Sequence, residues 1–490
     1  MSPDFRDGHD AAPVCHHWQI LADSEIQAIQ DAAWGFLQRV GYRILNRTLL
    51  EWLEKKGCVV DYPSSCVRVT PDVRRRLEDV ARRSAKTIPD EPLLRRPLSR
   101  GEAVGHNYTC YYDWTEGIRR PAGLEDIRRV VRAWQMIPEI IQTGPCMTAQ
   151  DVPMEIEPLV STVEAMKLTD KIRGLPEMML GEQLPFLEEL GHVLKDGKQP
   201  PIRYSGCSVN RFTVDGRAAS CLMATHERNG LRHWWINSCP VAGVTAPVTL
   251  AGAVTVGVAE TIGGWLAGWA CNDDISLGAV PLCGIVDMRT GGVRFSTPET
   301  ILMDSAIYQF FLGVYGIRVG LCTGYTDARI PGMQAVNDKM LKSLAYGLFT
   351  DTIGGQSGTL AAGNIYSPTQ QVLDIETNRQ TDQLAKGIEV NEHTLALDLI
   401  EQLAAAYDGV FLSEEHTLAH WRDQLWIPEY LQWDHGDESS PCRDADMRII
   451  ERAEKKWRDA MVAYRRPDID DRKIQAAQEV LSRATRNLLK

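Results

Sequence analysis

The sequence of 490 residues lacks several patterns that would assign it to a common functional class. No Gly-x-Gly-x-x-Gly follows its apolar runs, which argues against a dinucleotide fold, and no Gly-x-Ser-x-Gly indicates a serine hydrolase. The formal net charge of -12 argues against nucleic acid or an anionic membrane surface as a partner. The start of the chain lacks the charged-then-apolar pattern of a signal peptide, so we expect a cytoplasmic protein.

Paired metal-binding or disulfide motifs are also missing. The 12 cysteines show no close pairing, which is typical of reduced thiols rather than of a disulfide framework. His416 and His420 have the i, i+4 spacing of a zinc helix. The glutamate that a zinc protease carries directly after the first histidine is absent, however. We therefore interpret this segment as a capped helix and expect no metal site.

The most informative stretch runs from Arg232 to Asp273. His233–Asn237 reads as a buried strand, and Pro240 and Gly243 predict a turn after it. Thr245 is a candidate N-cap for an apolar helix over residues 248–270, with Pro247 in its first turn. That helix is long enough to span a membrane. Its central Glu260 and its five glycines favour a buried helix instead, so we expect no membrane association.

Between residues 137 and 376 short apolar runs alternate with helical patterns. About eight strand–helix repeats predict a (β/α)8 TIM barrel, with a doubly wound open sheet as the main alternative. The expected strands cover residues 137–144, 177–181, 202–210, 233–237, 275–284, 318–323, 351–360 and 371–376. We expect three parts: an N-terminal helical/β extension (1–136), the barrel (137–440) and C-terminal helices (441–490).

In a barrel, the active site lies at the carboxyl ends of the strands. Aromatic and polar residues follow those ends, and few groups suited to acid–base chemistry accompany them. Aromatic rings bind quaternary ammonium groups through the ring quadrupole. Successive side chains of a strand point to opposite faces, so Trp234 and Trp235 cannot both face inward. The candidate substrate-binding residues are Trp234, Trp235, Asn237, Tyr325, Asp327, Arg329, Gln356 and Tyr366.

A family resemblance rests on the segment PVAGVTAPVTLAGAVTVGVAETIGG, from Pro240 to Gly264. It resembles the P-L-x-G-x-T-A-P-V-T-L-A-G stretch of the trimethylamine methyltransferase family, which precedes a helix containing Ala-Glu. Further matches follow in the expected order from about residue 140 to the C-terminus. They are Phe295–Glu299, Tyr315–Ile317, Thr326–Ala328, Ser367-Pro368, Val372-x-Asp374-x-Glu376, Gly387–Val390, His416–His420 and Leu425-Trp426-x-Pro428.

The resemblance implies a TIM barrel that moves a methyl group from an amine to the cobalt of a corrinoid (cobalamin) protein. Namesake members carry pyrrolysine, whereas this sequence has only standard residues and is similar to the pyrrolysine-free branch that acts on glycine betaine. The leaving group of a quaternary amine is a neutral amine, so no proton has to be delivered first. Cobalt(I) is the nucleophile, so no catalytic side chain is expected, and the protein acts by positioning.

The resemblance also implies roles for the candidate residues. Trp234, Trp235 and Tyr325 would form the cation cage, Asp327 would supply a countercharge, and Arg329 would pair with a substrate carboxylate. Gly243, Thr245 and Ala246 would meet the corrin through backbone N–H groups. We expect a corrinoid protein, a small quaternary amine and a second copy of the chain as partners. The alternative is a non-catalytic member that binds such a cation as a sensor or regulatory subunit.

Overall fold

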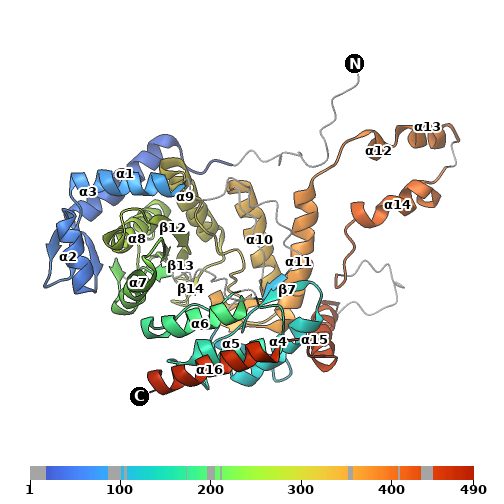
Figure 1. Ribbon diagram of the computed structural model, residues 1–490. Coiled ribbons are helices and arrows are strands. Elements are labelled where there is room, and N and C mark those ends of the chain that lie inside the picture. The colour runs from blue at the N-terminus through green and yellow to red at the C-terminus, as the bar shows by residue number, and fades with distance from the viewer. Residues whose placement is uncertain are drawn as a thin grey trace.

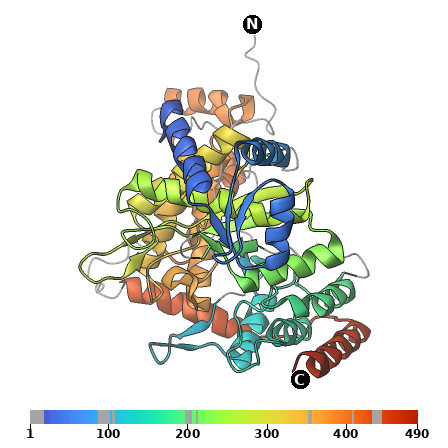
Figure 2. The ribbon, with the colours of Figure 1, turned by 90° about the vertical axis from the view of Figure 1, so that its left-hand side faces the viewer.

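The structure is a computed structural model that describes residues 18–85, 101–103, 108–172, 174–195, 205–209, 212–350, 357–406, 409–431 and 445–489. It is a mixed α/β protein in which helices surround several small sheets (Figure 1). The first elements are α1 (Asp23–Arg39), β1 (Tyr42–Ile44), α2 (Arg47–Lys55), β2 (Val59–Asp61), β3 (Cys66–Arg68) and α3 (Pro71–Ala85). Strand β1 pairs with β3 and, in parallel, with β9 (Thr213–Val214). These elements pack over the side of the molecule that holds α8, as the rotated view shows (Figure 2).

The middle of the chain alternates strands and helices as expected. Its elements are β4 (Gly101–Ala103), β5 (Cys110–Asp113), β6 (Ile118–Pro121), α4 (Leu124–Met136), β7 (Ile140–Thr143), α5 (Glu157–Met166), α6 (Leu184–Leu194), β8 (Ser205–Cys207), α7 (Gly216–Asn229), β10 (His233–Ser238), β11 (Val241–Ala242), α8 (Leu250–Cys271), β12 (Ser276–Pro281), β13 (Gly284–Val286), β14 (Val293–Arg294), α9 (Pro298–Tyr315), α10 (Met333–Phe349), β15 (Thr359–Leu360), β16 (Ile365–Tyr366) and α11 (Pro368–Lys386).

Several strands in this region pair in parallel, among them β11 with β13 and β5 with β16. Strands β8, β10 and β12 form one parallel sheet with β10 in the centre. Strands β4 and β7 pair in parallel, and Thr143 continues that pairing to Ile172. Within the described residues, the hydrogen bonds do not close these strands into a barrel. A mixed α/β fold is therefore confirmed, with parallel pairing of the predicted strands at β8, β10 and β12, whereas β15 pairs antiparallel with β16. The division of the chain at residues 137 and 441 stays a prediction.

Three predicted strands are not formed as expected. Residues 177–181 form no strand, since the Gln183 side chain accepts the backbone N–H groups of Met179 and Leu180 that a ladder would use. Residues 318–323 form no strand either, although Gly320 N–H donates to Ala279 O beside β12. The prediction of a strand over residues 371–376 was wrong, because these residues belong to α11.

Helix α8 is the centre of the larger hydrophobic core. It is long and apolar enough to cross a membrane, and 72% of its most apolar window is buried inside the protein. The helix packs against α1, α2, α9, β1 and β10. Its glycines permit close approach, since a Cβ at Gly263 would lie 2.1 Å from the Tyr42 ring of β1 and one at Gly268 would lie 2.5 Å from the Trp234 ring of β10. Its burial explains the apolar composition without a membrane.

The C-terminal part contributes to a second core and to a protruding arm. Helices α15 (Ala445–Val462) and α16 (Asp471–Leu488) pack against α4, α5 and α6. Helices α12 (Glu392–Leu395), α13 (Leu397–Ala406) and α14 (Glu415–Gln424) extend outward beyond the end of α11 (Figure 1). We call residues 388–427 the arm.

Candidate functional site

The two faces of β10 have different surroundings. Trp234, Ile236 and Ser238 are buried, whereas Trp235 and Asn237 are half-buried and the next residue of that series, Cys239, is exposed. This alternation follows from the two-residue period of a strand. The face carrying Trp235, Asn237 and Cys239, which we call the open face, is the one that a solute can reach.

Polar contacts connect the open face across neighbouring strands. The Asn237 side-chain amide donates to Ser205 Oγ at 3.2 Å, and it lies 3.7 Å from Cys207 Sγ. Ser205 Oγ in turn donates to Glu177 Oε1 at 2.8 Å. The Asn237 side chain is therefore held in place by its neighbours.

The indole of Trp235 lies over β12. A Cβ atom on Gly278 would come within 2.7 Å of Trp235 Cε2, so the glycine leaves the space that the ring occupies. Since Trp235 remains partly exposed, its ring can present apolar surface to a bound cation.

Trp234 belongs to the core. It is fully buried, and its Nε1–H donates to Gly264 O of α8 at 2.8 Å. Trp235 therefore lies on the open face, whereas Trp234 packs against α8.

Tyr325 approaches the same region from another segment. Its ring contacts Gly363, where a Cβ would lie 2.7 Å from Cε1. Burial raises the pKa of its hydroxyl, and the nearby thiols of Cys322, Cys239 and Cys207 add to this effect. The Tyr325 ring is therefore a neutral aromatic group near the strand ends.

The sequence did not indicate the cysteines near these strands as a group. Cys207 ends β8, Cys239 follows β10 and Cys283 comes two residues after β12, whereas Cys322 lies in residues 318–323, which form no strand. Burial raises the pKa of the Cys322 thiol to about 12. This thiol is therefore protonated at neutral pH, and a protonated thiol is a poor nucleophile toward a methyl donor.

Glu260 is a second residue that the sequence analysis did not assign to the site. Its carboxyl group is buried in α8 and accepts a hydrogen bond from the backbone N–H of Cys239. Burial raises its pKa to about 8, and Oε2 has no hydrogen-bond partner among the described residues. The sequence did contain a signal for Glu260, because it is a single carboxylic acid inside a long apolar helix.

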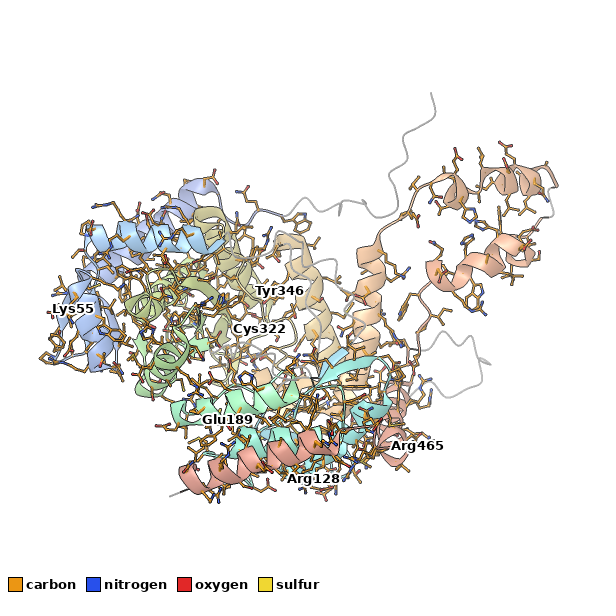
Figure 3. The ribbon with its side chains drawn as sticks, viewed as in Figure 1. Lys55, Arg128, Glu189, Cys322, Tyr346 and Arg465 are labelled. Atoms are coloured by element: carbon orange, nitrogen blue, oxygen red, sulfur yellow. The ribbon has the colours of Figure 1, made fainter. Side chains whose placement is uncertain are left out.

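A buried charged network lies behind these strand ends. Asp304 accepts hydrogen bonds from Cys283 N–H and from the Tyr346 hydroxyl, each at 2.7 Å. Burial raises the pKa of Asp304 and lowers that of Lys342, whose Nζ has no hydrogen-bond partner in the described part of the chain. Tyr346 belongs to this network, and Cys322 lies close enough to interact electrostatically with Asp304 and Lys342. Both residues are labelled in Figure 3.

The remaining candidate residues are dispersed. Asp327 accepts the backbone N–H groups of Phe295 and Ser296, so its carboxylate anchors the segment before α9. Arg329 is exposed. Tyr366 is fully buried and its hydroxyl accepts a hydrogen bond from Trp134 Nε1 at 3.0 Å. Gln356 lies outside the described residues.

The loop from Gly243 to Pro247 differs from the expectation. Helix α8 begins at Leu250 with Thr249 as its N-cap, so Thr245 is not the cap. Instead, Thr245 Oγ1 accepts the N–H of Val241 at 2.8 Å. The N–H groups of Thr245 and Ala246 both donate to Val241 O, and Gly243 N–H donates to Ala246 O. These three amides are therefore used within the loop.

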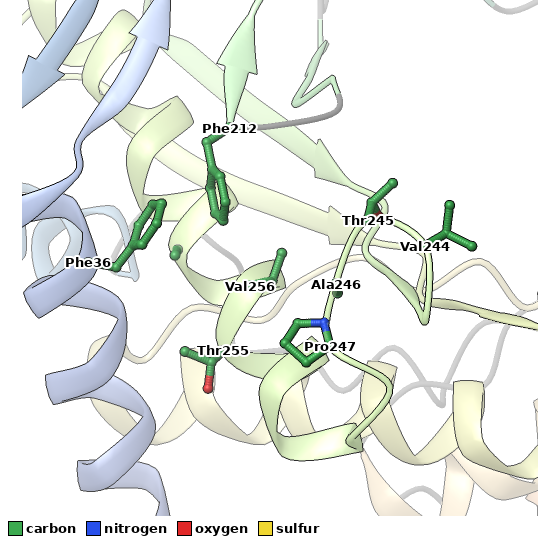
Figure 4. A pocket seen from close by; sticks show the side chains of 9 residues that line it. Phe36, Phe212, Val244, Thr245, Ala246, Pro247, Thr255 and Val256 are labelled. Atoms are coloured by element: carbon green, nitrogen blue, oxygen red, sulfur yellow. The ribbon is translucent and has the colours of Figure 1, made fainter.

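A surface cavity of about 370 Å³ adjoins this loop. The rings of Phe36 and Phe212, 4.3 Å apart, form one side of it, and Thr245, Ala246 and Pro247 form another (Figure 4). Val244, which also lines the cavity, is exposed, and so is Val248, the residue after Pro247. The loop thus offers an apolar surface rather than free backbone donors.

Comparisons with known proteins identify the same family as the motifs between Pro240 and Pro428. The family model described as trimethylamine methyltransferase (MTTB) matches residues 11–488. Glycine betaine methyltransferase of Desulfitobacterium hafniense is 24% identical over 94% of this chain and 96% of its own length. Trimethylamine methyltransferase MttB of the same species is 22% identical over 82% of each chain.

A solved structure, the hydroxylamine complex of MtmB, covers 89% of this chain and 98% of its own at 13% identity with a TM-score of 0.37. A score this low does not establish a common fold. The family model, however, spans almost the whole sequence. The chain therefore belongs to the trimethylamine methyltransferase family and is a methyltransferase.

Proposed function

We propose that this methyltransferase transfers a methyl group from a quaternary amine, glycine betaine or a related betaine, to the cobalt(I) of a corrinoid protein. The observation that carries the proposal is the open face, where a half-buried indole lies beside neutral polar groups. The relative named glycine betaine methyltransferase, which matches nearly end to end, supports the same substrate class.

The chemistry required of the protein is positioning. A bound corrinoid would supply the cobalt nucleophile. Trp235 would contact the trimethylammonium group through its ring face, and Tyr325 would border it from the opposite segment. Asn237, fixed by Ser205, would orient the substrate through its amide. The neutral thiol of Cys322 near the site would resist alkylation by the substrate.

Glu260, rather than Asp327 as expected from the sequence, would supply the countercharge to the substrate cation. Its carboxyl group is protonated in part at neutral pH, since burial raises its pKa to about 8. A nearby cation favours the ionised form of a carboxyl group. We therefore propose that substrate binding and ionisation of Glu260 are coupled, so that binding near pH 7 releases a proton.

The loop of residues 243–248 would contact a corrinoid partner through apolar side chains, and not through its backbone N–H groups as we expected from the sequence. The amides of residues 243–246 form hydrogen bonds within the loop, whereas the apolar side chains of Val244 and Val248 are exposed. The N-terminal amides of α8 follow directly, and Thr249 makes no side-chain cap hydrogen bond to them. These residues would hold the partner through apolar contact, with the α8 amides facing a polar group of the cofactor.

We further propose that the β8–β10–β12 sheet and the β4–β7 pair are parts of one (β/α)8 barrel. Ser205 contacts Glu177 between them, and Gly320 continues the β12 edge. A cytoplasmic location and assembly with a second copy of the chain remain part of this proposal.

The proposal is tested by mixing the protein with cob(I)alamin and each of glycine betaine, carnitine, proline betaine and choline. We expect at least one of them to give the spectral change from cob(I)alamin to methylcobalamin. No change with any of the four would count against transfer from a quaternary amine. Binding of a betaine without turnover would favour the sensor alternative.

A further inference from the structure

The arm has little hydrophobic core of its own. Helices α12 and α14 contain no buried residue in the part of the chain described here. Several large apolar side chains of the arm face solvent, with exposed fractions of 88% for Ile388, 77% for Leu412 and 64% for Leu418. Short helices with so little apolar burial need another source of stability.

Three histidines converge where α12 meets α14. The ring centroids of His416 and His420 are 4.6 Å apart, those of His393 and His420 are 4.8 Å apart, and those of His393 and His416 are 6.2 Å apart. His416 and His420 lie one turn apart on α14, on the same side of the helix. His393 comes from α12, whose start is fixed by the Asn391 side chain accepting Thr394 N–H at 2.8 Å.

We propose that His393, His416 and His420 together bind a divalent transition-metal ion of the zinc class. A zinc–nitrogen bond is about 2.0–2.1 Å, so three imidazoles around one tetrahedral ion have ring centroids about 5 Å apart. The three observed separations lie on either side of that value. Imidazole is a preferred ligand of zinc, copper and nickel, and it binds in its neutral form.

The lack of a hydrogen bond at one ring nitrogen supports this metal site. His416 Nε2 is buried and makes no hydrogen bond in the described chain. Such a buried nitrogen is costly unless a proton donor or a metal ion occupies its lone pair. Within the described residues no group of three or more His, Cys, Asp or Glu side chains is positioned to hold a metal ion as it stands, so the three imidazole rings must rotate about their side-chain torsions on binding. His393 is exposed and the other two are half-buried, which gives an ion an entry path.

The inferred site is structural. The glutamate that a zinc hydrolase places after the first histidine is Thr417 here, and its hydroxyl donates to Phe411 O. An ion held by one histidine of α12 and two of α14 would join the two ends of the arm. Since ligands from separate helices meet only in the folded arm, binding free energy becomes folding free energy there.

The test uses the full-length protein after removal of metal with a chelator. Titration with Co²⁺ followed by visible spectroscopy should give the absorption of a low-symmetry imidazole site, saturating at one ion per chain. Equilibrium dialysis with Zn²⁺ should give the same stoichiometry. Hydrogen exchange should show slower exchange in α12 and α14 when Zn²⁺ is present. These readouts do not depend on methyl transfer, so they stand apart from the proposed function.

Single substitutions His393→Ala, His416→Ala and His420→Ala should each weaken Zn²⁺ binding by at least about ten-fold, since each removes a ligand. His233→Ala, outside the cluster, serves as the control and should bind Zn²⁺ as the unmodified chain does. Absence of stoichiometric Co²⁺ and Zn²⁺ binding by the unmodified chain would overturn the proposal. Undiminished binding by the variant lacking all three histidines would overturn it as well.

Discussion

The indole of Trp235 rests against Gly278, so that a Cβ on residue 278 would lie 2.7 Å from Cε2 and 2.8 Å from Cδ2 of the ring. The two residues are paired in register on β10 and β12. The position of the Trp235 ring at the open face therefore depends on the space that Gly278 leaves on β12. Any side chain at residue 278 must move the indole.

Gly278→Ala should therefore displace Trp235 and weaken betaine binding. A contact below 3.0 Å against a rigid ring cannot be absorbed without movement, and small misplacements in a site are costly. We expect a loss of affinity of about ten-fold or more by calorimetry, in line with lost cation–π contacts. Gly174→Ala is the matched control, because its Cβ would meet no atom within 4 Å. Equal affinities for both variants would contradict the role of the Trp235 ring.

Substitutions of the adjacent tryptophans should separate binding from stability. Trp235→Ala should weaken substrate binding by roughly ten-fold or more, since a desolvated cation–π contact contributes about 2 kcal/mol. Trp234→Phe should leave affinity unchanged and lower the free energy of unfolding by about 1–3 kcal/mol, because Gly264 O loses its buried donor. Calorimetry and denaturant unfolding measure the two effects. The reverse pattern would place Trp234 on the substrate side.

Glu260 should make stability depend on pH. Its pKa is about 8 in the folded protein and near 4.5 in the unfolded chain, so the folded state binds more protons between these values. The free energy of unfolding should therefore fall as pH rises from about 4.5 to about 8, with a contribution approaching 1.4 kcal/mol per pH unit. Glu260→Gln should remove this contribution. Parallel pH profiles for the two proteins, from denaturant unfolding, would show that Glu260 titrates normally.

Asp327→Asn should affect stability more than substrate charge recognition. The carboxylate accepts the N–H groups of Phe295 and Ser296, and an amide can accept with only one oxygen. We expect a loss of about 1–3 kcal/mol in the free energy of unfolding. The affinity for glycine betaine, measured below the unfolding transition, should stay within about two-fold. A large loss of affinity with unchanged stability would restore Asp327 as a countercharge.

Local patterns predicted much of this structure. The two-residue period of β10 showed that Trp234 and Trp235 face opposite ways, and the apolar run with Glu260 indicated a buried helix. The error at residues 371–376 had a local signal, because Ser367 caps α11 and Pro368 opens it. Other features depend on tertiary contacts. Neither the Gln183 side chain that replaces a ladder at residues 177–181 nor the approach of His393 to α14 follows from spacing.

The fate of the methyl group tests the central claim most directly. Glycine betaine with deuterated N-methyl groups is mixed with the protein and cob(I)alamin, and both products are analysed by mass spectrometry. We expect deuterated methylcobalamin and dimethylglycine in equal amounts, with a rate that falls in Trp235→Ala at subsaturating substrate. If glycine betaine binds but every deuterated methyl group stays on nitrogen, with carnitine, proline betaine and choline equally inert, quaternary-amine methyl transfer is contradicted.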